Sequence, residues 1–241
     1  MLCQFTVKNF KSIRDEVTFD MQAAAISEHE DRIIIDKDEE KYLPVSAIYG
    51  PNGGGKSNVL AALHTLVAKV LRPLFATEDS EEKVLLQKKI IVEPFVFSES
   101  KDEPTEFELF FRTTVSEYRY ILHVKRDIVL YESLDRIKLE TGRKSALFTR
   151  DENGIGLKGT FAKLKVSDEL SKTLTLLSYL GIAYKGNAVV KDVLSWFEYG
   201  IEFLNYGNPI QELKMAVSTS EEVKQLMLQM IQEMDLDIVD F

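Results

Sequence analysis

Hydrophobic and polar positions alternate over residues 2–7, among side chains that favour β-structure. This period of two predicts a strand with one buried face. A turn over residues 9–12 and a second such run over residues 17–21 predict a return strand. Residues 28–41 are charged except for the apolar run 33–35, which predicts a loop containing a short strand.

Residues 45–49 form a short apolar run that stops at Gly50 and Pro51, which is typical of a buried strand. Apolar side chains then recur at intervals of three and four residues, at Val59, Leu60, Leu63, Leu66, Val67 and Val70. This spacing predicts a helix over residues 58–72, ended by Pro73. Residues 77–83 are polar and acidic and are expected to form an exposed loop.

The pattern returns to β-structure between residues 90 and 148. Runs rich in β-branched and aromatic side chains cover residues 91–97, 106–113, 118–124 and 128–133. Their short polar breaks predict antiparallel hairpins or a meander. Beyond residue 162 the spacing is helical, with expected helices over residues 167–180, 188–203 and 220–234, the last preceded by a cap at Thr219 and Ser220.

This order of elements predicts a mixed α/β protein with parallel and antiparallel strands and an inserted β-subdomain. We expect three parts. They are an N-terminal lobe over residues 1–80, an antiparallel β-subdomain over residues 85–160, and a helical lobe over residues 161–241.

Composition narrows the class of protein. The chain has 241 residues, 45% of them hydrophobic, and a formal net charge of −9, which excludes a uniformly basic surface for coating nucleic acid. Its one cysteine, Cys3, allows no internal disulfide and is expected to be a small buried residue. No apolar run reaches the roughly 20 residues of a membrane span, so we expect a cytoplasmic protein with no membrane partner.

The strongest motif is the segment Gly50-Pro51-Asn52-Gly53-Gly54-Gly55-Lys56-Ser57, which has the spacing of a phosphate-binding P-loop. Glycines let the backbone wrap a phosphate closely and turn its N–H groups inward. Lys56 supplies a charge for the β- and γ-phosphates, and the Ser57 hydroxyl is the expected Mg²⁺ ligand. The helix that follows adds its N-terminal dipole.

A second acidic motif, which hydrolysis needs, is missing from the sequence pattern. Four apolar residues followed by Asp-Glu do not occur after the P-loop. Residues 33–36 end in an aspartate but predict an edge strand, and residues 235–240 interleave their acids with apolar residues. We therefore expect part of an ATPase core to lie beyond residue 241 or on another chain.

The residues GPNGGGKSN at 50–58 resemble the Walker A motif of ABC-type ATPases of the RecF and SMC group. The opening residues FTVKNFKSIR at 5–14 are similar to that group's first strand and turn. Three shorter segments, PF at 94–95, YESL at 131–134 and LFTR at 147–150, resemble a bacterial subfamily described as ATP/GTP phosphatase-like, often encoded in anti-phage or abortive-infection operons.

The resemblance implies an ABC-type P-loop NTPase head, incomplete at its C-terminus, that sandwiches ATP and Mg²⁺ between two copies. The residues that it places around the nucleotide are Asn52, Gly53, Gly54, Gly55, Lys56, Ser57, Asn58, Lys11, Ser12 and Arg14. Gly54 replaces the group's more usual serine, and the signature, Walker B and switch-histidine motifs are absent. Gln87 is a weak candidate for the group's Q-loop glutamine.

Other residues admit two interpretations. Arg136, Lys138, Arg143, Lys144 and Arg150 favour a mixed-charge surface hairpin, with a DNA or RNA contact as the alternative. Lys11 and Arg14 could equally be surface charges. The aromatic pair Trp196-Phe197 favours core packing over an interface, and the apolar face of residues 220–234 favours packing against the rest of the core or a partner.

Three functions fit this sequence. The first is an ATPase head whose nucleotide-driven dimerisation controls a partner, such as a nuclease or other effector in phage defence. The second is a RecF/SMC-like DNA-repair ATPase, and the third is a scaffold that senses ATP without hydrolysing it.

Overall fold

The computed structural model describes residues 1–25, 30–75, 90–97, 99–167, 170–203 and 221–233. The chain divides into two compact units, Met1–Ile201 and Glu202–Phe241. In the described part of the second unit there is one helix, α6 (Glu221–Glu233), as the sequence predicts. The three-part division expected from the sequence stays a prediction.

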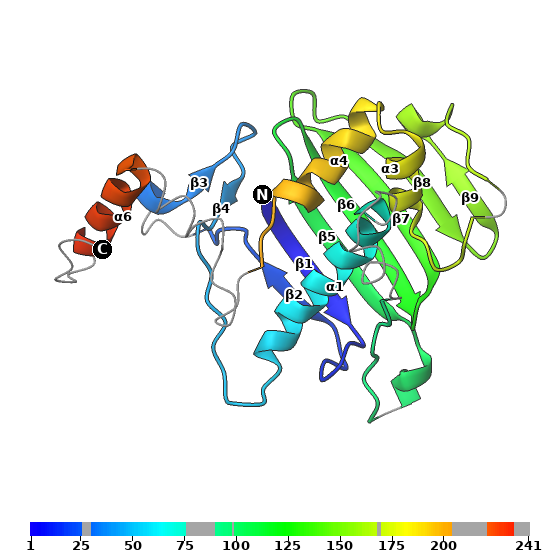
Figure 1. The fold of residues 1–241 in the computed structure, drawn as a ribbon, viewed down its shortest axis with the longest axis horizontal. Helices are drawn as coiled ribbons and strands as arrows, with labels where there is room; N and C mark the ends of the chain where they lie inside the picture. The colour runs from blue at the N-terminus through cyan, green and yellow to red at the C-terminus, as the bar shows by residue number, and fades with distance from the viewer. Residues whose placement is uncertain (26–29, 76–89, 98, 168–169, 204–220, 234–241) are drawn as a thin grey trace. The chain divides into compact units, whose positions relative to one another are not determined.

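The first unit is built on a seven-stranded sheet of order β2-β1-β5-β6-β7-β8-β9 (Figure 1). Its strands are β1 (Leu2–Lys8), β2 (Val17–Asp20), β5 (Thr105–Arg112), β6 (Ser116–Lys125), β7 (Ile128–Lys138), β8 (Lys144–Asp151) and β9 (Gly154–Leu157). Neighbouring strands run antiparallel throughout. The described residues therefore contain no parallel pair, contrary to the expectation, although the mixed α/β fold of a P-loop NTPase is confirmed.

One face of the sheet forms the core. Phe5, Leu109, Tyr120, Leu134 and Phe148 lie side by side across five strands. All five side chains are fully buried. They lie on the same face because side chains point to alternate faces along each strand.

Three helices cover this face: α1 (Lys56–Phe75), α3 (Leu176–Ala183) and α4 (Ala188–Tyr199) (Figure 1). On α4, the Trp196 ring lies 4.6 Å from that of Phe111 and the Phe197 ring lies 5.9 Å from that of Tyr120, measured between centroids. Both α4 aromatics are almost completely buried. Core packing of this pair, rather than an interface, is confirmed.

Helix α1 is, in the part of the chain that the structure describes, the one helix long and apolar enough to pass a membrane-span criterion. Its inner face is a core face, since Ala62, Leu66 and Val70 are completely buried in the protein. Amphipathic core helices meet the same criterion by length and composition.

The predicted buried strand over residues 45–49 is wrong. These residues are irregular and exposed, with Val45 and Tyr49 at 78% and 90% of their full accessibility. A buried strand needs neighbours that pair its N–H and C=O groups. The sheet places no strand beside these residues within the described ranges, and an apolar run alone cannot form one.

The predicted strand over residues 91–97 is also wrong, apart from an isolated bridge between Val92 and Arg126. Pro94 lacks a backbone N–H for a ladder at its centre. Its neighbours bond to a turn instead: Glu93 O accepts from Lys11 N at 2.9 Å, and Phe95 N donates to Asn9 Oδ1 at 2.9 Å.

Helix boundaries differ from expectation at three places. Helix α1 runs through Pro73 to Phe75, because proline itself adopts a helical φ and removes only one donor near the helix end. Helix α3 begins at Leu176 rather than near residue 167, since the Thr175 hydroxyl caps it by accepting from Ser178 N. Helix α4 ends at Tyr199, followed by Gly200, and does not reach residue 203.

Smaller predictions are confirmed. Strand β3 (Ile34–Ile35) is the expected short strand and pairs with β4 (Lys41–Tyr42). The structure adds short 3-10 turns that the sequence pattern does not predict, over Glu30–Arg32, Glu99–Asp102 and Gly159–Phe161. Cys3 is buried, and burial raises the pKa of its thiol to about 11, which suits an inert core cysteine. The loop at 77–83, Gln87, the cap at Thr219 and Ser220, and residues 235–240 lie outside the described residues.

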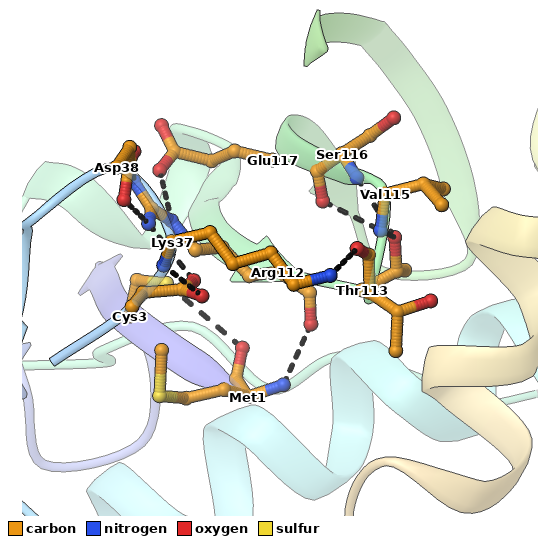
Figure 2. Close-up of polar contacts among 11 residues, drawn as sticks. Met1, Cys3, Lys37, Asp38, Arg112, Thr113, Val115, Ser116 and Glu117 are labelled. Atoms are coloured by element: carbon orange, nitrogen blue, oxygen red, sulfur yellow. Dashed lines mark hydrogen bonds and ion pairs between the residues drawn. The ribbon is translucent and has the colours of Figure 1, made fainter. Parts of the chain in front are cut away.

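The β3–β4 hairpin is held to the sheet by Arg112, the last residue of β5 (Figure 2). The guanidinium group, 6% exposed, donates to Asp36 at 3.0 Å, Asp38 at 2.6 and 2.8 Å, and Glu117 at 2.7 Å. The Met1 amine donates to Arg112 O at 2.6 Å beside it. This buried cation therefore joins the sheet to the segment that leads into residues 45–49.

Candidate phosphate-binding site

The P-loop has the backbone geometry that its glycines predict. Gly53 and Gly55 have φ values of +78° and +83°, which side chains other than glycine rarely adopt. At Gly54 a Cβ would lie 3.0 Å from Pro51 O, a close contact that a shift of a few tenths of an ångström would relieve. Gly54 N donates to that same oxygen at 3.1 Å and closes the turn. The loop is therefore a tight turn with its backbone free of side chains.

Lys56 opens α1 and folds back over the loop. Its Nζ donates to Gly50 O at 2.7 Å and to Pro51 O at 2.8 Å. The ammonium group thus lies against the loop carbonyls, within the same turn that carries Gly53 and Gly55. A fixed positive charge inside a glycine turn suits a phosphate.

The start of α1 is electrostatically suited to an anion. The helix has 20 residues and no acidic side chain in its first turn. Its first N–H groups have no partner within the helix, and its dipole favours negative charge at this end. The expected ligands Asn52, Gly53 and Ser57 are exposed here and accessible to a nucleotide.

The donor set fits a nucleoside triphosphate better than a bare metal ion. The described ranges hold no group of three or more His, Cys, Asp or Glu side chains that could bind a metal. Ser57 would contribute its hydroxyl to Mg²⁺, together with phosphate oxygens, water and the acidic residue that a P-loop ATPase supplies from a second strand. In this arrangement the chain's own residues would hold phosphate, and would hold the ion through it.

Ser12 lies against the P-loop although it precedes Asn58, its hydrogen-bond partner there, by 46 residues. Its hydroxyl accepts from Asn58 Nδ2 at 2.6 Å. It also lies 3.1 Å from where a Cβ on Gly55 would be. The structure therefore brings Ser12, Gly55 and Asn58 together, and their place around a nucleotide stays a prediction.

Lys11 and Arg14 behave differently from Ser12. The Arg14 guanidinium donates to Asp15 at 2.8 to 3.1 Å, and both side chains are more than half exposed. Lys11 is exposed, and its ammonium lies 5.5 Å from the centre of the Phe10 ring. The contacts of these two cations are with their own neighbours in the turn rather than with the P-loop.

A second polar cluster, unrecognised in the sequence, joins the sheet to α1. Glu132 is completely buried on β7 and accepts from Leu176 N and Leu177 N at the start of α3, and from Tyr120 OH at 3.0 Å. Burial raises the pKa of Glu132, against the effect of these donors. Arg150 Nη1 lies 4.0 Å from the carboxylate.

The same cluster extends to the P-loop helix. Arg150 donates to Leu174 O at 2.6 Å and Ser171 O at 3.0 Å, and Ser178 Oγ donates to Val70 O on α1 at 2.6 Å. Glu132 and Arg150 lie in the YESL and LFTR segments. In the sequence, the sign of this buried pair was a charged residue at a core-facing position of each strand, Glu132 on β7 and Arg150 on β8.

Arg150 therefore does not belong to a basic surface. Arg136 also has a local partner, donating to Ser116 Oγ at 2.8 Å. Lys138, Arg143 and Lys144 are exposed. The mixed-charge hairpin is the interpretation that these positions favour.

Comparison with known proteins places this site in a family. A family model described as "AAA domain, putative AbiEii toxin, Type IV TA system" matches residues 45–208, which is more than half of the chain and includes the whole P-loop. No curated protein matches the sequence. With its glycine turn, Lys56 and mixed α/β fold, the chain belongs to this AAA-domain family of P-loop ATPases.

Proposed function

We propose that this chain binds ATP with Mg²⁺ at Gly50–Ser57 and is the nucleotide-binding part of an ABC-type, RecF/SMC-like ATPase. The observation that carries the proposal is the P-loop geometry, in which Lys56 closes over a glycine turn at the start of α1. The AAA-domain family supports the nucleotide. In the cell, two heads would close on ATP and control a partner effector, such as a nuclease, in cytoplasmic anti-phage defence.

The test is nucleotide affinity in the presence of Mg²⁺, measured by calorimetry or with a fluorescent ATP analogue. Lys56→Ala removes the ammonium from the loop and should weaken binding by about 10- to 100-fold, the range for one hydrogen bond to a charged group. Lys163→Ala is the matched control, because Lys163 is exposed outside the P-loop. Equal affinity of wild type and Lys56→Ala for ATP would contradict the proposal.

A nucleotide-sensing scaffold is the second candidate. It is favoured by one observation, that no run of four apolar residues followed by Asp-Glu occurs after the P-loop. Both candidates predict ATP binding, but only the first predicts turnover. Single-turnover hydrolysis by the full-length protein with its partner distinguishes them, since a scaffold retains ATP unchanged.

A DNA-repair role predicts ATP-dependent DNA binding that weakens steeply with salt. The formal net charge of −9 and the inward position of Arg150 argue against it. Titration of duplex DNA at two salt concentrations, with and without ATP, tests this alternative directly.

A further inference from the structure

We propose that Asn9 is a positioning residue for the phosphate site, acting through Ser12. The inference rests on the proposed nucleotide-binding function and goes beyond it. The Asn9 side chain is completely buried, and its hydrogen bonds to described residues go to residues 95, 103 and 104. Asn9 matters for the site because it fixes the turn over residues 9–12, which carries Ser12.

The Asn9 carboxamide bonds to two other segments. Nδ2 donates to Glu103 O at 3.0 Å and to Pro104 O at 3.2 Å, and Oδ1 accepts from Phe95 N at 2.9 Å. The Asn9 carbonyl accepts from Thr105 Oγ1 at 2.6 Å. One buried side chain thus satisfies three backbone groups far away in sequence.

The backbone of this turn also restricts which residue can occupy position 9. Asn9 and Lys11 have φ values of +56° and +50°, in the left-handed region that asparagine tolerates better than most residues. Phe10 and Ile13 exchange backbone hydrogen bonds at 2.8 and 2.7 Å, which makes a narrow turn. Lys11 N donates to Glu93 O, so the turn is fixed on the side of residues 93–95 as well.

Ser12 projects from this turn to the P-loop. Its bond to Asn58 Nδ2 and its approach to Gly55 depend on where the turn lies, because no other described side-chain bond holds Ser12. Asn9 fixes the turn to residues 93–95 and 103–105. Ser12 extends from the turn to the P-loop. Loss of the Asn9 carboxamide should therefore move Ser12 away from the phosphate site.

The test is ATP affinity of the full chain in Mg²⁺, at a temperature where circular dichroism shows each variant folded. Asn9→Gly removes the carboxamide but accepts the positive φ, and should weaken binding about tenfold, as expected when Ser12 is displaced and loses one hydrogen bond to a phosphate. Asn187→Gly is the matched control. Asn187 also accepts from two backbone N–H groups, those of Val189 and Val190, but it caps α4, and its loss should leave ATP affinity unchanged.

A double-mutant cycle tests whether Asn9 affects ATP binding through Ser12. Ser12→Ala should weaken ATP binding, and the double variant Asn9→Gly/Ser12→Ala should bind no more weakly than the weaker single variant. Additive losses would overturn action through Ser12. Thr105→Val removes only the bond to the Asn9 carbonyl and should give a smaller loss of the same kind, which keeps the test decisive if Asn9→Gly does not fold.

The outcomes also separate this inference from the proposed function. Wild-type protein that binds no ATP overturns both. Wild-type binding with equal affinity in Asn9→Gly overturns the positioning role alone. A loss in Asn187→Gly as large as that in Asn9→Gly would mean that both act through general stability, and it too overturns the positioning role.

Discussion

The P-loop region and the sheet–helix junction hold their polar groups in opposite ways. At the junction, Glu132 and Arg150 are buried; Glu132 accepts from the first N–H groups of α3, and Arg150 donates to carbonyls of the segment before that helix. In the P-loop region, Lys56 bonds to carbonyls of its own loop, and the apolar side chains of Val45 and Tyr49 are exposed. One region uses polar groups to fix the fold, and the other keeps them accessible to a ligand. Stability and binding should therefore respond to different substitutions.

The largest loss of stability is expected from Glu132→Ala. The change leaves Arg150 and two helix N–H groups buried without their carboxylate, and should lower the free energy of unfolding by about 3–5 kcal/mol. Denaturant unfolding measures this. Glu106→Ala is the matched control, since its pair with Lys8 at 3.1 Å is about one-third exposed and should be worth at most about 1 kcal/mol. Similar losses of unfolding free energy in Glu132→Ala and Glu106→Ala would show that the buried carboxylate contributes no more to stability than an exposed one.

Arg112→Ala should cost less, about 1.5–3 kcal/mol, the value of hydrogen bonds to a charged group. Its carboxylate partners are 17 to 30% exposed and can be solvated when the cation is lost. The β3–β4 hairpin should then become a site of limited proteolysis. An unchanged cleavage pattern between residues 34 and 42 would show that Arg112 does not hold the hairpin.

The same contact has a pH dependence of known sign. The hydrogen bond from Arg112 lowers the pKa of Asp38. A lowered carboxyl pKa contributes stability that is complete above the unfolded-state pKa of about 3.9 and is lost as pH falls through the folded value. Proteolysis of the hairpin by an acid-active protease should therefore increase as pH falls below about 3.9. Asp38→Asn should remove this part of the pH dependence.

Ser178→Ala tests the connection between the junction and the P-loop helix. The Ser178 hydroxyl donates to Val70 O in the core, so its loss should lower the free energy of unfolding by about 1 kcal/mol. ATP affinity should stay unchanged if the connection only supports α1. A tenfold weaker affinity would instead show that the junction also sets the position of the P-loop.

The smallest effect on stability is expected at the P-loop itself. Lys56→Ala and Tyr49→Ser alter exposed or loop positions, and each should change the free energy of unfolding by less than about 0.5 kcal/mol. Thermal unfolding without nucleotide measures this. Lys56→Ala should nevertheless lose the stabilisation that ATP gives to wild type. If Lys56→Ala were strongly destabilised without ligand, the P-loop would also be fixing the fold, contrary to the contrast between the P-loop region and the sheet–helix junction.

Local chemistry determined what the sequence revealed by itself. The glycine spacing and Lys56 predicted the phosphate loop, because its turn depends on φ values that glycine alone adopts freely. Alternating runs predicted β5, β6 and β7, and helical spacing predicted α1, α4 and α6. Each of these signals lies within a few neighbouring residues.

Tertiary structure decided the rest, because pairing and burial depend on residues far apart in the chain. It placed β1 beside β5, buried Glu132 and Arg150, and brought Ser12 to the P-loop. It also left residues 45–49 exposed, where the apolar run predicted a buried strand. Hydrophobicity shows that a segment favours burial, but only the neighbouring strands and helices determine whether it is buried.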